Sequence, residues 1–349
     1  MKDAQSLAVV DPSSVAVARR AARALTASFG FTETAAGRVA LIVTEAASNI
    51  LKHAGSGEVL LKTTSWGSSV GVEILALDKG PGMVNVAQCM RDGFSTSGGS
   101  GTGLGAMSRL SDLFDIFSAP RQGTAVFSRV WAGNCQPKHN GSFLEVDTVC
   151  LPIPSEEISG DGWAVSRFED HCLLMVCDGL GHGPLAADAA IEAIKVFNNN
   201  TKLPPAEIIG LADPALHGTR GAAMMVAQID FRARKVVTCG VGNISGAVIS
   251  PEKTAHLVSS DGIVGEIMGH PAEFSYEWGP QSVFVMHSDG MSSHWTLDRY
   301  PGITARHPAL IAGVLYRDYN KRHDDVTVMA ASSQAGNPDE WKRMIEKQG

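Results

Sequence analysis

No apolar run in this sequence is long enough to span a membrane. A membrane-spanning helix needs about 18 or more consecutive apolar residues, and the chain has no such run. The first residues, Met1-Lys-Asp-Ala-Gln-Ser, also do not form a basic region followed by a long apolar one, which is the pattern of a secretory signal. We therefore expect a cytoplasmic protein with no membrane partner.

Paired cysteines and an excess of positive charge are missing as well. None of the six cysteines stands in a C-x-x-C pair, which disfavours both a zinc site and a disulfide framework. The formal net charge is −7 and no basic stripe is present, so a nucleic-acid partner is not expected. The length of 349 residues, with 44% hydrophobic and 19% charged residues, indicates two ordinary globular domains.

Glycine, by contrast, is concentrated in residues 93–105, which are also rich in Ser and Thr and run directly into Ala106-Met-Ser-Arg-Leu. Glycine lets the backbone approach a ligand closely, and the start of a helix directs several free N–H groups to one place. This stretch therefore predicts a phosphate-binding segment. A flexible Gly/Ser linker is the alternative, and the amphipathic helix that follows at once disfavours it.

A polar ridge and a strand-end carboxylate flank this glycine stretch. After a helix over residues 15–28, capped by Ser13 or Ser14, a second helix over 34–53 places Glu45, Asn49 and Lys52 on one face. A solvated helix face is the alternative interpretation of that ridge. Strands over 58–64 and 70–77 lead to Asp78, and the turn that follows leaves this carboxylate free to accept a hydrogen bond from a ligand amine. A helix to about residue 110 and strands over 114–118 and 124–131 complete this part.

Four motifs in this order resemble the N, G1 and G2 boxes of the GHKL ATPases and kinases. They are Glu45-x-x-x-Asn49-x-x-Lys52, Asp78-x-Gly80-x-Gly82, Gly101-x-Gly103-x-Gly105 and Gly123-Thr124. The closer likeness, over residues 8–132, is to the anti-sigma-factor serine kinases of the RsbT and RsbW type. The resemblance implies a GHKL (Bergerat) α/β sandwich over residues 1–132 that binds ATP and Mg²⁺.

The resemblance also implies a role for each motif. Glu45 would be the base that takes the proton from the substrate hydroxyl, Asn49 would hold Mg²⁺, and Asp78 would recognise adenine. The remaining positions implied to contact ATP are Lys52, Gly80, Gly82, Gly101, Thr102, Gly103, Leu104, Gly105 and Thr124. Phosphoryl transfer needs mainly positioning, charge neutralisation and one group that orients the nucleophile, which agrees with these roles.

The second half repeats a different feature, an Asp at the end of a strand. Residues 133–141 indicate a linker. After them Asp178-Gly-Leu-Gly-His-Gly follows a predicted strand and opens a helix at Pro184, Asp289-Gly290 follows another strand, and Asp324-Asp325 precedes a third. Asp161 adds a fourth acidic point. A single Asp-Gly pair is only a turn, but four strand-end carboxylates in one domain favour oxygen ligands for Mg²⁺ or Mn²⁺.

This set resembles the PPM-type metal-dependent Ser/Thr phosphatases, in their SpoIIE-like branch with RsbU and RsbX. The resemblance implies an α-β-β-α sandwich over residues 142–333, followed by a polar tail over 334–349, and so an α+β chain overall. It implies two Mn²⁺ or Mg²⁺ ions, of which Asp178 would bridge both and would be catalytic. The metal ligands would be Asp161, Asp178, the Gly179 carbonyl, Asp289 and Asp324. A structural role is favoured for His182, while Arg220 is open between a substrate contact and a surface role.

Together the two resemblances predict a bifunctional partner-switching regulator. It would phosphorylate and dephosphorylate Ser or Thr of a STAS-domain anti-sigma-factor antagonist, with a sigma factor as a possible further partner and a homodimer as a possible assembly. One alternative is a phosphatase whose ATP-binding domain only senses nucleotide or docks the target. The other is a non-catalytic protein that sequesters a sigma factor or an antagonist.

Overall fold

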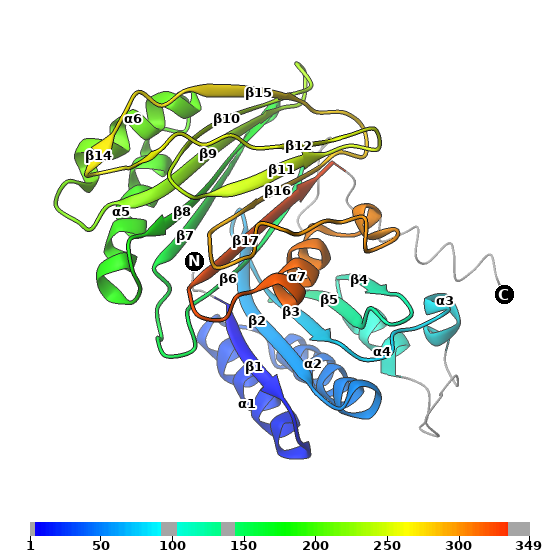
Figure 1. Ribbon diagram of the computed structural model, residues 1–349. Coiled ribbons are helices and arrows are strands. Elements are labelled where there is room, and N and C mark those ends of the chain that lie inside the picture. The colour runs from blue at the N-terminus through cyan, green and yellow to red at the C-terminus, as the bar shows by residue number, and fades with distance from the viewer. Residues whose placement is uncertain (1–3, 92–102, 134–143, 334–349) are drawn as a thin grey trace. The chain divides into compact units, whose positions relative to one another are not determined.

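A computed structural model describes residues 4–91, 103–133 and 144–333 (Figure 1). These residues divide into two compact units. The first holds the described residues up to 133 together with Leu297–Arg317, and the second holds 144–296 and 318–333. The chain therefore leaves the second unit at residue 297 and returns to it at 318. The expected linker over 133–141 and the polar tail over 334–349 lie almost wholly outside the described residues.

An antiparallel sheet of five strands, in the order β1-β2-β3-β5-β4, forms the centre of the first unit. The strands are β1 (Gln5–Val9), β2 (Gly57–Trp66), β3 (Ser69–Asp78), β4 (Leu113–Ser118) and β5 (Thr124–Trp131). Four of them were predicted. The edge strand β1 was not, because it is short and mostly exposed and so lacks the alternation that reveals a half-buried strand.

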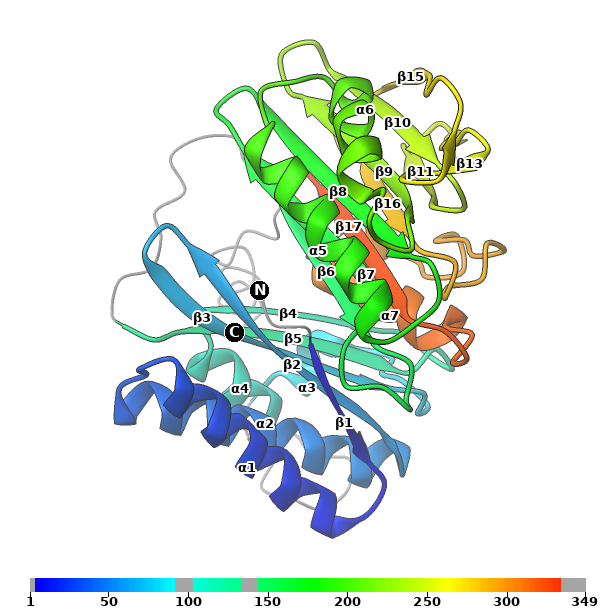
Figure 2. The same cartoon turned by 90° about the vertical axis from the view of Figure 1, so that its left-hand side faces the viewer.

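Helices cover one face of this sheet, as Figure 2 shows for α1 and α2. Within residues 4–91 and 103–133 the helices are α1 (Pro12–Ser28), α2 (Glu33–Ala54), the short α3 (Val86–Cys89) and α4 (Gly103–Leu110). Apolar residues of α2 such as Val39, Ile42 and Val43 share one core with Val59 and Ile74 of the sheet. The hydrophobic spacing that predicted α2 thus marks the side that is buried.

The residue that caps the start of α1 is Asp11, whereas Ser13 or Ser14 was predicted. The Asp11 carboxylate accepts hydrogen bonds from the backbone N–H groups of Ser13 and Ser14, while the Ser14 hydroxyl accepts one from the N–H of Asp11. This reciprocal pair is a capping box. The helix therefore begins at Pro12 with Asp11 as its cap, and Ser13 and Ser14 lie inside the first turn.

The opposite face of the sheet is covered by Leu297–Arg317, which we call the arm. It contains the 3₁₀ turn η1 (Ile303–Ala305) and most of helix α7 (Pro308–Tyr319). A Cβ added to Gly313 would lie 2.6 Å from Leu75, and the His307 ring stacks on Phe127 with centroids 4.4 Å apart. The sequence placed these residues with the phosphatase half, but the structure groups them with the first unit, because the second face of the sheet is apolar and needs a covering layer.

The second unit contains two stacked five-stranded sheets, β15-β10-β9-β8-β7 and β12-β11-β16-β17-β6, with a shared apolar core. Helices α5 (Pro184–Asn199) and α6 (Pro205–Leu216) pack on the outer side of the first of these sheets (Figure 2). The strands are β6 (Glu145–Leu151), β7 (Asp161–Arg167), β8 (His171–Gly179), β9 (Ala222–Asp230), β10 (Lys235–Val241), β11 (Ser245–Ile249), β12 (Thr254–His256), β15 (Glu273–Glu277), β16 (Val283–His287) and β17 (Val326–Ser332), with a small pair formed by β13 (Gly262–Ile263) and β14 (Ile267–Met268).

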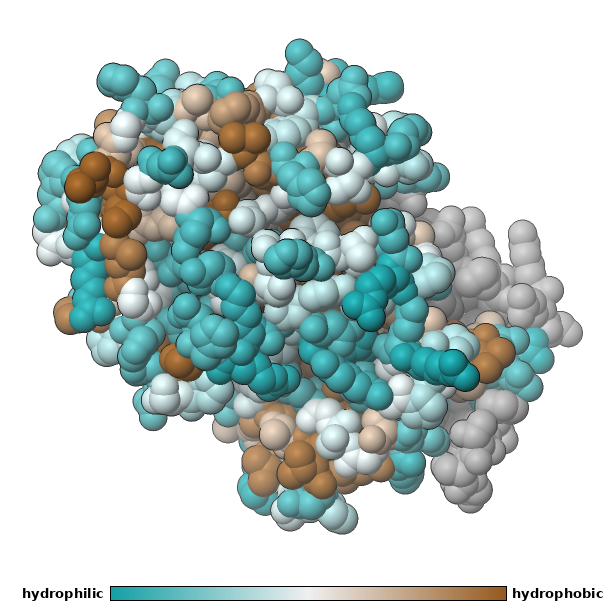
Figure 3. Space-filling model, viewed as in Figure 1, coloured by the Kyte–Doolittle hydropathy of each residue, from teal (hydrophilic) through white to brown (hydrophobic). Residues whose placement is uncertain are grey.

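The surface of the described residues is mixed in polarity. On the face drawn in Figure 3, hydrophilic and intermediate residues predominate, and apolar residues gather in small separate groups. No helix within residues 4–91, 103–133 and 144–333 is long and apolar enough to cross a membrane. Of the five described cysteines, Cys150, Cys172, Cys177 and Cys239 are buried, in keeping with a role as small core residues.

Candidate active sites

The polar ridge of α2 faces the first residue of α4. A Cβ added to Gly103 would lie 3.1 Å from Glu45 Oε2 and 3.4 Å from both Nδ2 and Oδ1 of Asn49. The backbone at the start of α4 therefore reaches the carboxylate and the amide together, and a larger residue would crowd both. Lys52 lies further along the same helix and is exposed. Leu104 and Gly105 belong to the first turn of α4, whereas Gly101 and Thr102 lie outside the described residues.

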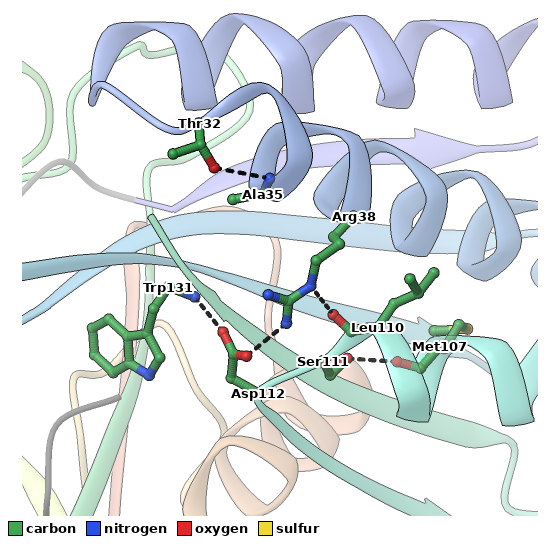
Figure 4. A network of polar contacts seen from close by, with 8 residues as sticks. All are labelled: Thr32, Ala35, Arg38, Met107, Leu110, Ser111, Asp112 and Trp131. Carbon is green, nitrogen blue, oxygen red and sulfur yellow. Dashed lines mark hydrogen bonds and ion pairs between the residues drawn. The ribbon is translucent and has the colours of Figure 1, made fainter. Parts of the chain in front are cut away.

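A hydrogen-bond network at the other end of α4 holds this helix against α2 (Figure 4). Arg38 on α2 donates from Nε to the Leu110 carbonyl at 2.7 Å and from Nη2 to Asp112 Oδ1 at 2.6 Å. The other Asp112 oxygen accepts from the Trp131 N–H at 2.7 Å. The C-terminal end of α4 is thereby tied to α2 and β5, which sets the direction in which its glycine end points.

Asp78 ends β3 in the first unit and is held by two backbone groups. Its Oδ1 accepts from the N–H of Gly80 at 2.8 Å and of Thr124 at 3.2 Å. Within the described residues both hydrogen bonds fall on Oδ1, which leaves Oδ2 for a ligand donor. Burial raises the pKa of Asp78, and these two N–H groups oppose that rise. The geometry suits a partly buried carboxylate that accepts one hydrogen bond from a ligand.

Two glycines close the turn beside this carboxylate. Gly82 has φ +71° and Gly123 has φ +69°, a region of backbone conformation that other residues rarely adopt. A Cβ at Gly82 would also collide with the Ala119 carbonyl, and one at Gly123 with the Asp78 carbonyl. Gly82 and Gly123 are therefore required by the backbone around Asp78, whether or not a ligand is bound.

In the second unit, acidic residues meet at the ends of two strands and the starts of two others. Asp161 begins β7 and lies opposite Asp178 of β8 in the strand register, Asp289 follows β16, and Asp324 precedes β17 by two residues. Burial, followed by the charges of Asp161, Asp289 and Asp324, raises the pKa of Asp178 to about 9. Burial chiefly raises that of Asp161 to about 7. The structure thus brings together the four carboxylates that the sequence singled out.

Neighbouring polar groups orient these carboxylates. The Ser288 hydroxyl donates to Asp161 Oδ2 at 2.6 Å, whereas Asp161 Oδ1 is buried and has no hydrogen-bond partner. Asn243 Nδ2 donates to Asp289 Oδ2 at 2.8 Å. Asp325 accepts from the N–H groups of Ile153 and Gly160, both at 2.6 Å, and so fixes the chain just before Asp161.

The sequence did not assign Ser288, Asn243 and Asp325 to the site. Two of them stand directly beside a predicted ligand, Ser288 before Asp289 and Asp325 after Asp324. Asn243 carried no comparable signal, because its partner Asp289 is far away in the chain. The hydrogen bonds that orient a ligand depend on tertiary contacts, which spacing along the sequence does not reveal.

The residues of this acidic cluster suit divalent cations. Their donors are all oxygen, the charges repel one another, and the buried Asp161 Oδ1 lacks a partner, each of which a hard cation would correct. Among the described residues, no three or more Asp, Glu, His or Cys side chains already surround one point as a finished metal cage.

Two residues next to the acidic cluster have other partners. His182 Nδ1 lies 2.9 Å from Glu156 Oε1, a contact that supports a structural role for His182. Arg220 is exposed, and its Nη1 donates to the Leu180 carbonyl at 3.5 Å. The guanidinium thus stands beside the loop that follows Asp178.

Comparisons with known proteins agree with this division. The model of the histidine kinase-like ATPase domain matches residues 8–128. The serine/threonine-protein kinase RsbT of Bacillus subtilis (strain 168) is 32% identical over 131 residues, which are 38% of this chain and 98% of RsbT. The chain belongs to the histidine kinase-like ATPase family. It is similar to RsbT within that family, as the order of the GHKL motifs predicted.

A second family accounts for the other half. The model of stage II sporulation protein E (SpoIIE) matches residues 169–334. The phosphoserine phosphatase RsbX of Bacillus subtilis (strain 168) is 28% identical over 142 residues, which are 39% of this chain and 69% of RsbX.

A solved structure from work on the bacterial stressosome, a modular system adapted to control secondary messenger signaling, is 30% identical with a TM-score of 0.51 and covers 54% of this chain and 99% of that one.

The two matches confirm the predicted fold class, a GHKL-type α/β sandwich followed by a PPM-type phosphatase fold. The chain thus joins a kinase-like domain and a phosphatase domain of the partner-switching type in one polypeptide.

Proposed function

We propose that this chain is a bifunctional regulator that adds phosphate to, and removes it from, Ser or Thr of a STAS-type anti-sigma-factor antagonist. ATP would be the phosphate donor, and Mn²⁺ or Mg²⁺ would serve the phosphatase. The observation that carries the proposal is the approach of Glu45 and Asn49 to Gly103, in the same unit as the Asp78 turn. Similarity to a kinase and to a phosphoserine phosphatase in one chain supports two opposed reactions.

In the kinase half the residues would act by position. Asp78 would accept a hydrogen bond from the adenine amine, and the backbone N–H groups at the start of α4 would contact the phosphates. Glu45 would take the proton as the substrate hydroxyl oxygen bonds to the γ-phosphorus, while the bond to the bridging oxygen breaks and ADP leaves. Asn49 and Lys52 lie on the same ridge, where an amide oxygen can hold Mg²⁺ and an ammonium can offset phosphate charge.

In the phosphatase half the acidic cluster would hold two cations through Asp161, Asp178, the Gly179 carbonyl, Asp289 and Asp324. When bound, such ions supply an activated water and neutralise phosphate charge. Ser288 keeps Asp161 in place, Asn243 does the same for Asp289, and Asp325 holds the backbone next to Asp161. The donors on Ser288 and Asn243 leave the second oxygen of each carboxylate for an ion.

A phosphatase whose ATP-binding domain only senses nucleotide is the second candidate. The position of the arm favours it. This segment lies within the SpoIIE-matched residues, but it packs on the sheet whose strand β3 ends at Asp78. Such a protein would bind ATP without transferring phosphate. The two candidates differ in one measurable property, the appearance of phosphate on the partner.

Incubation with γ-labelled ATP and candidate STAS-domain antagonists separates these candidates. The Asp178→Ala variant should raise the steady-state phosphorylation of the partner, since removal of phosphate is blocked, and Glu45→Ala should lower it, since transfer is blocked. Phosphoserine or phosphothreonine on the partner is measured by mass spectrometry. If Asp178→Ala accumulates no label on any antagonist that it binds, the first unit is a nucleotide sensor or docking domain and not a kinase.

A further inference from the structure

The arm connects two places that the proposed function treats separately. In sequence it lies between Asp289 and Asp324, inside the residues that the SpoIIE model matches. In space it belongs to the first unit. Its two ends are therefore joined to the acidic cluster by the chain, while the arm itself packs against the sheet of the kinase-like half.

The arm is anchored on that sheet by polar and aromatic contacts. The His307 N–H donates to Asp115 Oδ2 at 2.7 Å, and Arg306 Nη1 lies 3.4 Å from Asp115 Oδ1. Tyr300 meets Phe117 edge to face with ring centroids 6.1 Å apart. These contacts lie on β4 in addition to the stacking on β5, so the arm is held over two strands.

Arg317, at the end of the arm, reaches the adenine-side turn. Its Nη1 donates to the Asp78 carbonyl at 2.8 Å, and a Cβ at Gly123 would lie 2.9 Å from the same nitrogen. The side chain is only 7% exposed, so this contact is desolvated and correspondingly strong. The neighbouring Tyr316 donates instead to Glu58 Oε1 at 3.0 Å. Arg317 thus contacts the backbone of the residue proposed to recognise adenine.

The segments that flank the arm, residues 290–292 and 319–321, are joined to each other beside the acidic cluster. Met291 and Asn320 form an antiparallel bridge, the Ser292 N–H donates to the Tyr319 carbonyl at 2.9 Å, and the Lys321 N–H donates to the Gly290 carbonyl at 2.9 Å. All of these contacts lie within the second unit. They begin directly after Asp289 on one side and leave two residues before Asp324 on the other.

The entry into the arm is tied to the cluster by a second route. Trp295 Nε1 donates to His287 Nε2 at 2.9 Å, and His287 Nδ1 lies 2.8 Å from the Ser288 carbonyl. Ser288 in turn donates to Asp161. A displacement of the arm would therefore act on Asp161 as well as on Asp289 and Asp324.

We propose that Arg317 is a positioning residue for nucleotide recognition, and that through the arm nucleotide binding changes the activity of the phosphatase. The inference rests on the proposed function, since it takes the Asp78 turn as the adenine site. A nucleotide on Asp78 would alter the turn whose carbonyl Arg317 holds, and the pinned base of the arm would pass this change to the acidic cluster. Because binding linkage is reciprocal, ions at the cluster would change nucleotide affinity by the same factor.

The first test is calorimetric ATP binding to the full chain with Arg317 replaced. Arg317→Met keeps the bulk of the side chain but loses its donors, and we expect the affinity to fall roughly tenfold, with partial recovery in Arg317→Lys. Tyr316→Phe, which removes a donor one residue away that does not reach Asp78, is the matched control and should bind as the wild type does. Melting curves of each variant are the control for correct folding.

ATP binding to Asp78→Asn distinguishes a misplaced adenine site from a wrong role for Arg317. If Asp78→Asn binds ATP as the wild type does, the adenine site is misplaced and the proposed function loses its nucleotide site. If Asp78→Asn binds weakly while Arg317→Met binds normally, the adenine site stands and Arg317 does not position it.

The second test measures hydrolysis of p-nitrophenyl phosphate at fixed free Mn²⁺, with and without ADP. The wild type should change its turnover about fivefold or more when ADP is added, and Arg317→Met should respond far less at ADP concentrations that saturate it. A merely structural arginine would not remove this response while leaving basal turnover intact. Equal turnover of the wild type in the presence and absence of ADP would overturn the coupling.

Discussion

Both units contain acidic side chains that are removed from solvent, but the groups that surround these side chains differ between the two units. Glu73 on β3 lies 2.7 Å from Arg129 Nε and 3.1 Å from Lys62 Nζ. Burial acts to raise the pKa of Glu73, but these two cations outweigh it and lower the pKa to about 2. Asp178 in the second unit is partly buried, and there neighbouring carboxylates add to the effect of burial and raise its pKa to about 9.

The difference separates a structural charge from a binding site. Glu73 has its countercharge in the strands on either side of it, so this group is complete within the fold. Asp161 and Asp178 form no ion pair with a Lys or Arg within the described residues, so no protein cation offsets their charge there. A buried acidic group without protein cations is unfavourable in the apo protein and favours cation binding.

The largest expected effect is on phosphatase turnover. Asp178→Ala should lower hydrolysis of p-nitrophenyl phosphate more than about a hundredfold, because a carboxylate that we propose would hold the cations is lost. Asp188→Ala, at an exposed position of α5, is the matched control and should retain turnover. The melting temperature without metal should not fall in Asp178→Ala, since the group removed is a desolvated carboxyl beside other carboxyls. Full turnover in this variant would contradict the metal assignment.

The opposite result is expected for Glu73. Glu73→Gln should destabilise the first unit by about 3 kcal/mol, because the ion pairs of Glu73 with Arg129 and Lys62 are lost. Urea unfolding followed by tryptophan fluorescence measures this. An unchanged unfolding midpoint would mean that the ion pairs on β3 contribute nothing.

The acid dependence of stability sharpens the Glu73 assignment. Since the pKa of Glu73 is lowered from 4.5 to about 2 by folding, its contribution is fully present above pH 4.5 and is lost as the pH falls through the window from 4.5 to 2. In Glu73→Gln this part of the acid dependence should disappear. An equally steep loss of stability between pH 4.5 and 2 in the variant would assign it to other carboxylates.

Added cation should act on one acidic group only. Mn²⁺ at a hundred times its dissociation constant should stabilise the second unit by about 2.7 kcal/mol, and EDTA should reverse this. The matched control is Asp178→Ala, which should respond weakly. A rise in melting temperature of equal size in this variant would show that Mn²⁺ stabilises the protein elsewhere.

The smallest expected effect concerns Ser288, which orients Asp161 without being a ligand. Ser288→Ala should weaken Mn²⁺ binding by roughly tenfold, since second-layer partners of metal ligands have effects of this size. Turnover at saturating Mn²⁺ should change much less than the concentration of Mn²⁺ needed to reach it. A loss of turnover that no concentration of Mn²⁺ restores would show that Ser288 acts otherwise.

Much of both candidate sites could be predicted from the sequence because the signals are local. Glu45, Asn49 and Lys52 share a helix face by spacing alone, and Asp178 is marked by the strand before it and the glycines after it. The helix over 34–53 and most strands of both units lie close to their predicted positions, since each combines a clear period with turn residues at its ends.

The arm could not be predicted, because its partner strands are far away in the chain. Leu75, Leu77 and Phe127 alternate with inward residues as in any strand with two buried faces, and nothing local tells which segment covers the second face. The hydrogen bond from Arg317 to the Asp78 carbonyl was not predicted either, because these two residues are far apart in the chain and are matched by different family models. Capping was missed at Asp11 for a smaller reason, since Asp11, Ser13 and Ser14 are all residue types that can serve as caps.

The arm also determines how late in synthesis the fold of the first unit can be completed. The last strand of the first unit ends at Trp131, whereas the layer that covers Leu75, Leu77, Phe117 and Phe127 ends at Arg317. A ribosome that adds roughly 5–20 residues per second needs about 10–40 s for the intervening 180 or so residues. During that time an apolar sheet face is complete but uncovered, so the nascent chain would expose a site for chaperones until the second half emerges.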